Sequence, residues 1–429
     1  MTSGLRFRIV SVATALVLAV MLGACSDDSN SAAPAVTGDV RIGLLAPLSG
    51  VNAQVGQEAQ RGAELAAEVL NNSEETAGYD LAPVWGVSGS ARLSIVTADT
   101  ASDPRQAVAG TSRLITEHAV AGIVGAFEPE PTLDASQRAD RLRVPFVSGD
   151  IPMRALTERG LSWFFRLGPD ARAFASSFVS LLRGAEQPGM ERRRITVLYA
   201  ADTAGHDLRA TFAQLVDETD YEVVAEVGYQ AGDTDLTDEA RAVRASDPDI
   251  VLFSAAPGAG QALADALSGI GYAPPGVVVY GTVREADPLA ALPGMDGRVS
   301  RQVAWSQAIA QANPRAADIA ERYQRRYGLP MTEVAASAYT AVTALAQAIS
   351  DARSVEPEQV RTALVALDLP GSEMIMPWEG VRFDGTHQNT LADPVIEQAV
   401  GGQFAVVFPR DLAAGAFNWP ARNGASAGG

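Results

Sequence analysis

The side chains that could do chemistry in this chain lie in loops that directly follow apolar runs. Short aliphatic runs at residues 40–45, 121–126 and 144–147 are typical of buried strands. The loops after them carry hydroxyl and carboxyl groups, which bind small polar molecules through hydrogen bonds and charge. The residues concerned are Ser49, Glu128, Ser148 and Asp150, and Phe127 and Gly149 lie beside them in the same loops.

Enzyme chemistry finds little support in the same sequence. The chain has no lysine, because all 33 of its basic residues are arginine, and this excludes a P-loop lysine, a Schiff-base lysine and a Ser-x-x-Lys site. The three histidines are scattered along the chain, and neither an HExxH motif nor a Cys/His zinc spacing occurs. We therefore expect no enzyme, no metal and no cofactor.

The acidic balance of the chain limits its partners. With 33 Lys and Arg against 51 Asp and Glu, the net charge is −18 and the pI is about 4.6. This argues against nucleic acid or an anionic lipid surface as a partner. The 429 residues are enough for two or three ordinary domains, and 47% of them are hydrophobic, as in a globular protein.

Residues 1–24 are typical of a secretory signal. Two arginines precede an apolar run at residues 9–22, which is short for a membrane span and has no basic stop after it. The run ends at Leu22-Gly23-Ala24-Cys25, which resembles the lipobox of bacterial lipoproteins, where the signal is cut before a cysteine that carries a diacylglycerol. The alternative is an ordinary signal with an incidental cysteine.

Cys25 is the single cysteine of the chain, so the exported protein forms no internal disulfide. If Cys25 carries a lipid, residues 25–38 form a flexible tether, and the protein is anchored to the outer face of the cytoplasmic membrane. At the other end, the glycine-rich residues 416–429 are expected to be a disordered tail.

Strand and helix patterns alternate after the tether. From residue 53 to residue 70, apolar residues recur every three or four positions, which predicts an amphipathic helix after the first strand. Such strand–loop–helix units repeat to residue 147 and again to residue 280, so we expect an α/β fold with two doubly wound parallel-sheet lobes. Three late helical patterns, at residues 314–327, 333–351 and 357–367, have no sheet of their own and are expected to cover the first lobe.

Ligands bind such sheets beyond the carboxyl ends of the strands, so the loop at residues 47–57 is one expected wall of a site. Short motifs with a shared order and spacing run from residue 40 to about residue 408: 41–44, 47–50, 56–64, 99–107, 123–125, 144–147, 323–328, 338–342 and 383–384. In this respect the chain resembles the leucine/isoleucine/valine-binding family of extracytoplasmic solute-binding proteins of ABC transporters, which have the type I periplasmic-binding fold.

The resemblance implies two lobes joined by three crossover segments, with a cleft that closes on ligand by a hinge motion. Lobe 1 would comprise residues 39–167 and 303–378, and lobe 2 residues 168–302 and 379–415. The crossings would lie near residues 166–169, 298–304 and 378–382. The protein would act as a monomer that binds a small-molecule ligand and delivers it to the transmembrane subunits of an ABC permease. The alternative is a ligand sensor or an activator of an envelope enzyme on the same fold.

The resemblance also implies where ligand would bind. Family members hold ligand with a serine-rich loop after the fourth strand, where this chain has Phe127, Glu128 and Pro129, and with the next loop, here Ser148, Gly149 and Asp150. Val55 replaces an aromatic residue, with Gln54 and Asn52 as polar neighbours. In lobe 2 the expected contacts are Thr203, Ala204 and Arg284.

These differences from the family lead to a hypothesis about the ligand. Acidic residues follow the strands of lobe 1, at Glu128, Glu130 and Asp150, and few aromatic walls are present. We therefore expect a neutral polar or cationic ligand, such as an amide, a basic compound or a peptide fragment. Two alternatives stay open, namely that Glu128 and Glu130 form a solvated loop tip and that Arg284 pairs with Asp287.

Overall fold

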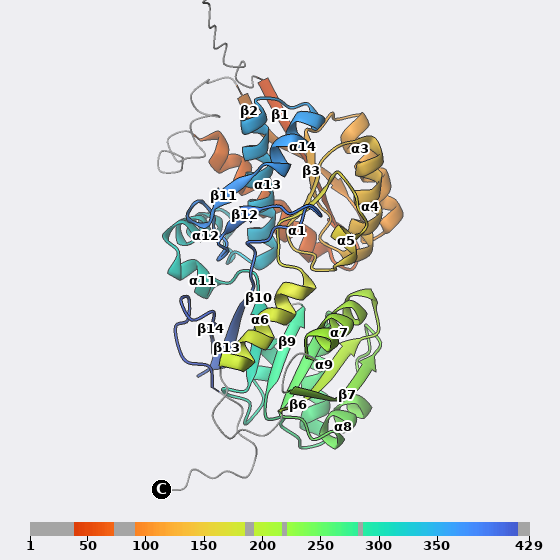
Figure 1. The fold of residues 1–429 in the computed structure, drawn as a ribbon, viewed down its shortest axis with the longest axis vertical. Helices are drawn as coiled ribbons and strands as arrows, with labels where there is room; N and C mark the ends of the chain where they lie inside the picture. Colours follow the sequence, from red (N-terminus) through yellow and green to blue (C-terminus); the bar gives the residue numbers. More distant parts are fainter. Residues whose placement is uncertain (1–37, 73–90, 185–192, 217–220, 282–285, 419–429) are drawn as a thin grey trace, which may run out of the picture. The chain divides into compact units, whose positions relative to one another are not determined.

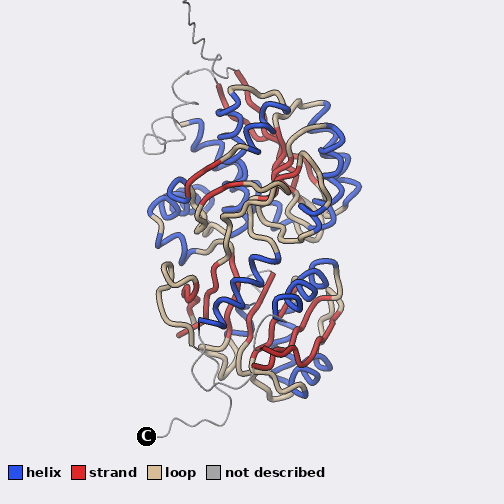
Figure 2. Tube along the Cα trace, in the orientation of Figure 1, coloured by secondary structure: helices blue, strands red, loops and turns tan. Residues whose placement is uncertain are grey.

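The computed structural model describes residues 38–72, 91–184, 193–216, 221–281 and 286–418. The predicted signal, Cys25, its tether up to residue 37, Arg284 and the tail from residue 419 lie outside the described residues. Helices and strands alternate along most of the chain and form two principal sheets, each with helices around it (Figures 1 and 2). We call the parts built on these sheets the first lobe and the second lobe. The predicted α/β fold with two mainly parallel lobes is confirmed.

The first lobe is built on a parallel sheet of five strands: β1 (Gly38–Ala46), β2 (Ala91–Asp99), β3 (Gly122–Gly125), β4 (Phe146–Ser148) and β5 (Phe164–Arg166). Their order across the sheet is β2-β1-β3-β4-β5. Both faces of β1 are buried, since Ile42 and Leu44 join one apolar cluster and Leu45 joins another. This explains the unbroken apolar sequence of the strand.

Helices cover both faces of this sheet: α1 (Ala53–Asn71), α3 (Pro104–Thr116), α4 (Pro129–Leu142), α5 (Ala155–Glu158), α12 (Pro314–Tyr327), α13 (Glu333–Ala352) and α14 (Pro357–Val365). Residues of α1, α12, α13 and α14 share the apolar cluster of Ile42 and Leu44, whereas residues of α3 and α4 share that of Leu45. The late helices therefore return to the first lobe, as predicted.

The second lobe is built on a sheet of seven strands: β6 (Arg193–Ala200), β7 (Tyr221–Tyr229), β8 (Ile250–Ala255), β9 (Val277–Gly281), β10 (Val299–Val303), β13 (Val395–Val400) and β14 (Gln403–Phe408). Their order is β14-β13-β10-β9-β8-β6-β7, and β13 runs antiparallel to both of its neighbours. The helices of this lobe are α6 (Ala171–Gly184), α7 (Thr203–Val216), α8 (Thr237–Ala245), α9 (Ala259–Gly269) and α10 (Ala286–Ala290).

The described chain passes between the lobes after β5, after β10 and before β13. After β10 it continues through α11 (Gln307–Ala312) into α12. Before the last passage it forms a small antiparallel ribbon of β11 (Asp368–Pro370) and β12 (Gly380–Arg382), joined through the short helix η2 (Gly371–Glu373). Because Trp378 and Val381 belong to the apolar core of the first lobe, the last passage begins after β12, later than the expected segment 378–382.

Three further differences from the sequence predictions have a local cause. Helix α4 begins at Pro129 rather than at residue 132, because a proline fits the first helical position, where no N–H donor is needed. Strands β5, β10 and β13 were not predicted. They are short or interrupted by polar residues such as Gln302, whose side chain donates to the carbonyl oxygen of Phe174 at 2.7 Å. Residues 416–418, the expected start of the tail, are held to β13 by hydrogen bonds between Gln398 and Asn418.

Candidate functional site

The carboxyl ends of β1, β3 and β4 lie side by side, because these strands are neighbours in one parallel sheet. Loops at such an edge are where α/β sheets bind ligands. The structure thus places the predicted first-lobe residues along one edge, although they come from separate parts of the chain: Ser49, Gln54, Val55, Phe127, Glu128, Ser148, Gly149 and Asp150.

Ser49 is tied to the next strand rather than free. Its hydroxyl donates to Asp99 Oδ2 at 2.6 Å, and the backbone N–H groups of Leu48 and Ala101 donate to Oδ1, each at 2.8 Å. Burial would raise the pKa of Asp99, but these hydrogen bonds outweigh it, and the pKa is lowered. The carboxylate therefore fixes the loop after β1, and the Ser49 hydroxyl is already used.

Glu128, like Asp99, connects loops through hydrogen bonds. Only 7% of the residue is exposed, and its carboxylate accepts hydrogen bonds from Asn52 Nδ2 at 2.6 Å and from Thr100 Oγ1 at 3.3 Å. It thus joins the loops after β1, β2 and β3. Glu130, by contrast, is exposed in the first turn of α4. Of the acids expected near ligand after β3, one is already paired and the other faces solvent.

The remaining predicted residues of these two loops differ in exposure. Phe127 is 5% exposed and packs in the apolar core of the first lobe. Val55 is half-buried against the same core. Gln54 is exposed and donates to Glu58 Oε1 at 3.1 Å. None of the three presents an aromatic wall at the strand ends.

The end of β4 has a different character, because polar atoms there are buried without a partner. Among the described residues, nothing forms a hydrogen bond with Ser148 Oγ, Asp150 Oδ1 or Ser337 Oγ. Ser148 and Ser337 have no exposed surface. Gly149 lets the strand end approach α13, since a Cβ atom on it would lie 2.8 Å from the carbonyl oxygen of Ser337. Burial raises the pKa of Asp150 to about 7.

Glu333 completes this group from the first turn of α13. Glu333 and Ser337 are one helical turn apart and therefore lie on one face of the helix. Burial raises the pKa of Glu333 to about 8, and the negative charge of Asp150 adds to the effect, although the backbone N–H of Ala304 donates to Glu333 Oε1 at 2.9 Å. We call Ser148, Asp150, Glu333 and Ser337 the β4-edge cluster.

Sequence reasoning found only half of this cluster. Ser148 and Asp150 follow a predicted strand, which is a local signal. Glu333 and Ser337 lie in a helix that is distant in sequence, and an acid in the first turn of a helix is commonly explained by the helix dipole. The one signal was the prediction that residues 333–351 return to the first lobe.

The predicted second-lobe residues lie at the start of α7. Asp202 Oδ1 accepts a hydrogen bond from the backbone N–H of Gly205 at 2.8 Å, which fixes the first turn that contains Thr203 and Ala204. Thr203 is exposed and Ala204 is half-buried. Arg284 and its suggested pairing with Asp287 lie outside what the structure describes, and Asp287 itself lies 3.5 Å from Arg301.

An ion pair connects the two lobes next to these residues. Arg154, just before α5 in the first lobe, donates from its backbone N–H to Asp207 Oδ2 at 3.0 Å and from Nε to Oδ1 at 3.1 Å. Asp207 lies in the first turns of α7 in the second lobe. The contact was not predicted, because neither residue is placed by a local pattern near the other.

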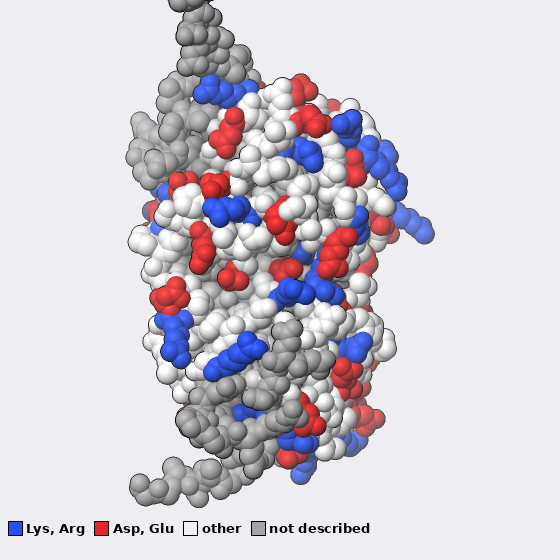
Figure 3. All heavy atoms as spheres, viewed as in Figure 1, with Lys and Arg blue, Asp and Glu red and all other residues white. Residues whose placement is uncertain are grey.

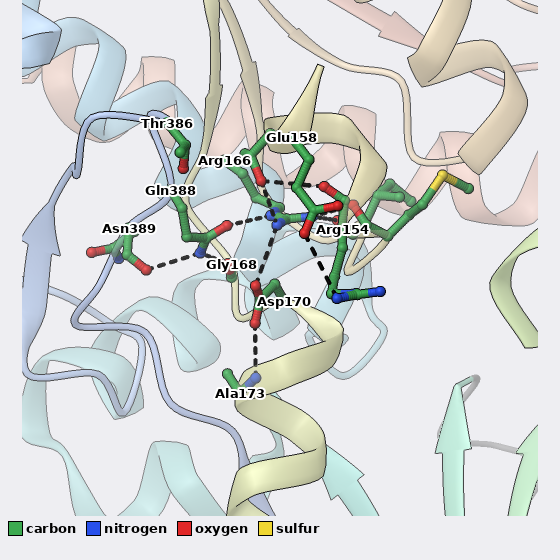
Figure 4. Close-up of polar contacts among 12 residues, drawn as sticks. Arg154, Glu158, Arg166, Gly168, Asp170, Ala173, Thr386, Gln388 and Asn389 are labelled. Carbon is green, nitrogen blue, oxygen red and sulfur yellow. Dashed lines mark hydrogen bonds and ion pairs between the residues drawn. The ribbon is translucent and has the colours of Figure 1, made fainter. Parts of the chain in front are cut away.

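Arg166, the last residue of β5, is buried at the first passage between the lobes (Figure 4). Its guanidinium donates to Gln388 Oε1, to Thr157 Oγ1 at 3.0 Å and to the carbonyl oxygens of residues 151 and 153, and it lies 3.7 Å from Asp170. Burial lowers the pKa of Arg166 to about 10, so it stays charged at neutral pH. Arg166 thereby holds together the first and last passages of the chain, which also form a β-bridge between Arg166 and Gln388.

Two hollows of the described residues lie away from the predicted site residues. One small cavity of about 30 Å³ lies in the first lobe and is lined by residues that include Leu70, Tyr339 and Met374. A wider surface hollow of about 630 Å³ is lined by residues that include Asn71 and Arg326. Neither is lined by a predicted site residue. Arginines and acids are interspersed over the face shown in Figure 3, so charge alone marks no separate binding surface there.

The family described as "Periplasmic binding protein" matches residues 39–395, and the chain belongs to it. Among relatives, it is 26% identical over 386 residues to Leu/Ile/Val-binding protein homolog 7 of Brucella abortus, a match that covers 88% of this chain and 93% of the relative. The resemblance inferred from the short motifs is thus confirmed.

Solved structures with the same fold have bound chemically different ligands. The branched-chain amino acid transporter substrate binding protein from Streptococcus pneumoniae, in complex with isoleucine, has a TM-score of 0.69 and 19% identity, covering 86% of this chain and 100% of that one. An ABC transporter solute binding protein from R. palustris in complex with benzoate has a TM-score of 0.66 and 17% identity, covering 86% and 96%. The type I periplasmic-binding fold is therefore established, but it does not determine the ligand.

The family defines the chain as an extracytoplasmic solute-binding protein rather than an enzyme. No helix within the described ranges is long and apolar enough to cross a membrane. Within the same ranges, no group of three or more His, Cys, Asp and Glu residues could hold a metal ion.

Proposed function

We propose that this protein captures a small polar solute between its two lobes and delivers it to an ABC permease. The observation that carries the proposal is the β4-edge cluster. It combines two predicted ligand residues, Ser148 and Asp150, with buried polar atoms that have no partner among the described residues. An unsatisfied buried polar group costs roughly 1–3 kcal/mol, which a ligand with matching hydrogen-bond groups would regain. The names of the relatives support amino acids as the ligand class, and we extend this class to amides and related compounds.

Hinge closure is the motion we propose for capture. The described chain passes between the lobes after β5, after β10 and before β13. The first and last of these passages are joined at Arg166 and Gln388. Such an arrangement favours rotation of one lobe against the other about a small number of residues. Ligand would bind between the first-lobe strand ends and the start of α7, near Thr203 and Ala204.

We further propose that the mature protein begins at Cys25, that a lipid on this residue anchors it to the outer face of the cytoplasmic membrane, and that it works as a monomer. The lipobox-like sequence at residues 22–25 supports this location, and the tether that follows would let the lobes reach a permease. Membrane fractionation of the wild type and a C25A variant tests the anchor. The variant is expected in the soluble fraction.

Ligand capture itself is tested by mass spectrometry of small molecules released on heating the purified full chain. We expect a single dominant small polar compound that binds again to the ligand-free protein and raises its Tm. At a ligand concentration of one hundred times Kd, the free energy of unfolding should rise by about 2.7 kcal/mol. A chain that releases no compound, and is stabilised by no amino acid, amide or amine, would contradict the proposal.

A further inference from the structure

We propose that the ligand presents a positively charged nitrogen to Asp150, with the hydroxyl groups of Ser148 and Ser337 as its other hydrogen-bond partners. The protein would then be a receptor for a protonated amine or guanidinium compound. This inference rests on the proposed function and names the ligand class of that same site.

The first argument is the construction of the cluster. The backbone at the end of β4 is held in place, since the carbonyl oxygen of Ser148 accepts a hydrogen bond from the N–H of Leu167 at 2.8 Å. Gly149 then brings Ser337 of α13 to the strand, and a Cβ atom on Gly149 would lie 3.2 Å from Ser337 Cβ. Three polar atoms without partners thus come from the end of β4, the loop after it and α13.

The second argument is charge. Asp150 and Glu333 are close enough for the charge of Asp150 to raise the pKa of Glu333. Among the described residues, neither acid forms an ion pair with an arginine. The arginines around the passages already have acidic partners. Arg154 pairs with Asp207, Arg166 lies near Asp170, and Arg301 lies 2.8 Å from Glu397. Asp150 therefore lacks a counter-charge that a cationic ligand would supply.

The third argument is the hydrogen-bonding capacity of the hydroxyl groups of Ser148 and Ser337. The serine hydroxyls can accept hydrogen bonds from an ammonium or guanidinium group, which has donors only.

The protonation of Asp150 agrees with this assignment. Burial raises its pKa to about 7, so the carboxyl exchanges its proton near neutral pH. A bound cation would favour the ionised form, and binding would release a proton. The charged group near Asp150 on α13 is Glu333, whose pKa the charge of Asp150 helps to raise, and Arg166 of β5 donates to the backbone carbonyl oxygens of residues 151 and 153.

The experiment compares cationic probes with compounds that lack an amine, on the full chain freed of co-purified ligand. The cationic probes are putrescine, agmatine and L-arginine, and the compounds without an amine are 1,4-butanediol, 4-methylpentanoate and glutarate. Isothermal titration calorimetry at pH 7.5 is expected to detect binding of at least one cation and proton release in buffers of different ionisation enthalpy. Failure of every cation to bind would overturn the inference.

Variants test the role of Asp150. D150N keeps the shape of the side chain and removes its charge, and it is expected to weaken binding of the cation roughly 10- to 100-fold, as for a charged hydrogen bond. S337A is expected to weaken binding by a smaller factor, and E130Q, which removes an exposed acid on α4, is the control without effect. Unchanged cation affinity in D150N would overturn the inference.

The two proposals can fail separately. Binding of only 4-methylpentanoate or glutarate, with lobe closure, would keep the proposed function and overturn the cationic assignment. A protein that binds none of the probes and releases no compound on heating would contradict both.

Discussion

The carboxyl groups of Asp150 and Glu333 both lie in the β4-edge cluster, where the fold opposes their ionisation. Burial raises the pKa of Asp150 from 3.8 to about 7 and that of Glu333 from 4.5 to about 8. A carboxyl whose pKa is raised by folding stabilises the fold fully below its unfolded pKa, and this contribution is lost as the pH rises through the folded pKa. For these two groups the loss falls between about pH 4 and pH 8.

D150N should reveal this loss, because an amide does not ionise. We expect D150N to be about as stable as wild type at pH 4 and more stable at pH 8. Each pKa unit corresponds to about 1.4 kcal/mol, and since Asp150 is only partly enclosed, we expect a gain of about 1–2 kcal/mol. Urea unfolding at both pH values measures it. D238N, a charge removal on the exposed surface of α8, is the control, and a D150N variant less stable than wild type at pH 8 would contradict the argument.

At the scale of residues, the sequence predicted where the site residues lie but not whether their polar atoms have hydrogen-bond partners. Ser148, Gly149 and Asp150 could be proposed because they follow an apolar run. Whether each polar atom has a partner depends on residues that are remote in sequence. Thus Glu128 is paired with Asn52 and Thr100, whereas Ser148 and Asp150 keep unpaired atoms.

At the scale of elements, the contact between α1 and α13 covers one face of the first sheet. Gly62 of α1 permits it, because a Cβ atom at this position would lie 2.1 Å from the carbonyl oxygen of Ala335. The obstructing atom belongs to the backbone of a helix and cannot move aside without shifting α13. The glycine is therefore a packing requirement, although alanine is the better helix former.

G62A is accordingly expected to destabilise the protein by about 1–3 kcal/mol, the usual cost of overpacking. G269A is the matched control, since a Cβ atom on Gly269 at the end of α9 would meet nothing within 4 Å. We expect G269A to be at least as stable as wild type, with a gain of up to about 1 kcal/mol from helix propensity. Guanidinium unfolding of both variants gives the comparison, and equal stability of G62A and wild type would show that α13 can yield.

Most elements could be predicted from periodicity, because long amphipathic helices and buried apolar strands carry their own signal. The exceptions were elements stabilised by distant partners. Strand β10 contains Arg301 and Gln302, and β13 contains Glu397, which pairs with Arg301 at 2.8 Å across the sheet. Polar residues of this kind do not resemble a buried strand until their partners are known.

At the scale of the whole molecule, the Arg154–Asp207 ion pair links the first lobe to α7. Both side chains are largely enclosed, with 20% and 16% of their surface exposed. Two hydrogen bonds join the residues, one from the backbone N–H of Arg154 and one from its Nε. Charged hydrogen bonds of this kind contribute more than pairs on the open surface. The pair therefore favours the described arrangement of the two lobes.

D207N should weaken this link by about 1–2 kcal/mol. We expect a larger radius of gyration in small-angle X-ray scattering of the ligand-free protein, because a greater fraction of molecules would have separated lobes. D238N provides the control, since it removes an Asp–Arg pair of 2.8 Å that lies within α8. An unchanged radius of gyration in D207N would mean that the pair does not hold the lobes.

The two-lobe organisation could be predicted from the succession of strand–helix units and from the family resemblance. The end of the first lobe could not, because β11 and β12 are short and their burial against residues such as Trp378 has no local signal. The pairing of Arg166 with Gln388 was equally hidden, since it joins two passages of the chain that are far apart in sequence.

The return of α13 to the first sheet has a consequence for how the protein is made. A ribosome that has synthesised β1 to β5 has produced every strand of that sheet, yet α13, which shares the apolar cluster of Ile42 and Leu44 with α1, is still untranslated. The growing chain must therefore carry part of this apolar face uncovered until residue 352 has emerged. Export before folding, with the lobe closing only after the late helices have crossed the membrane, would suit such an order of synthesis.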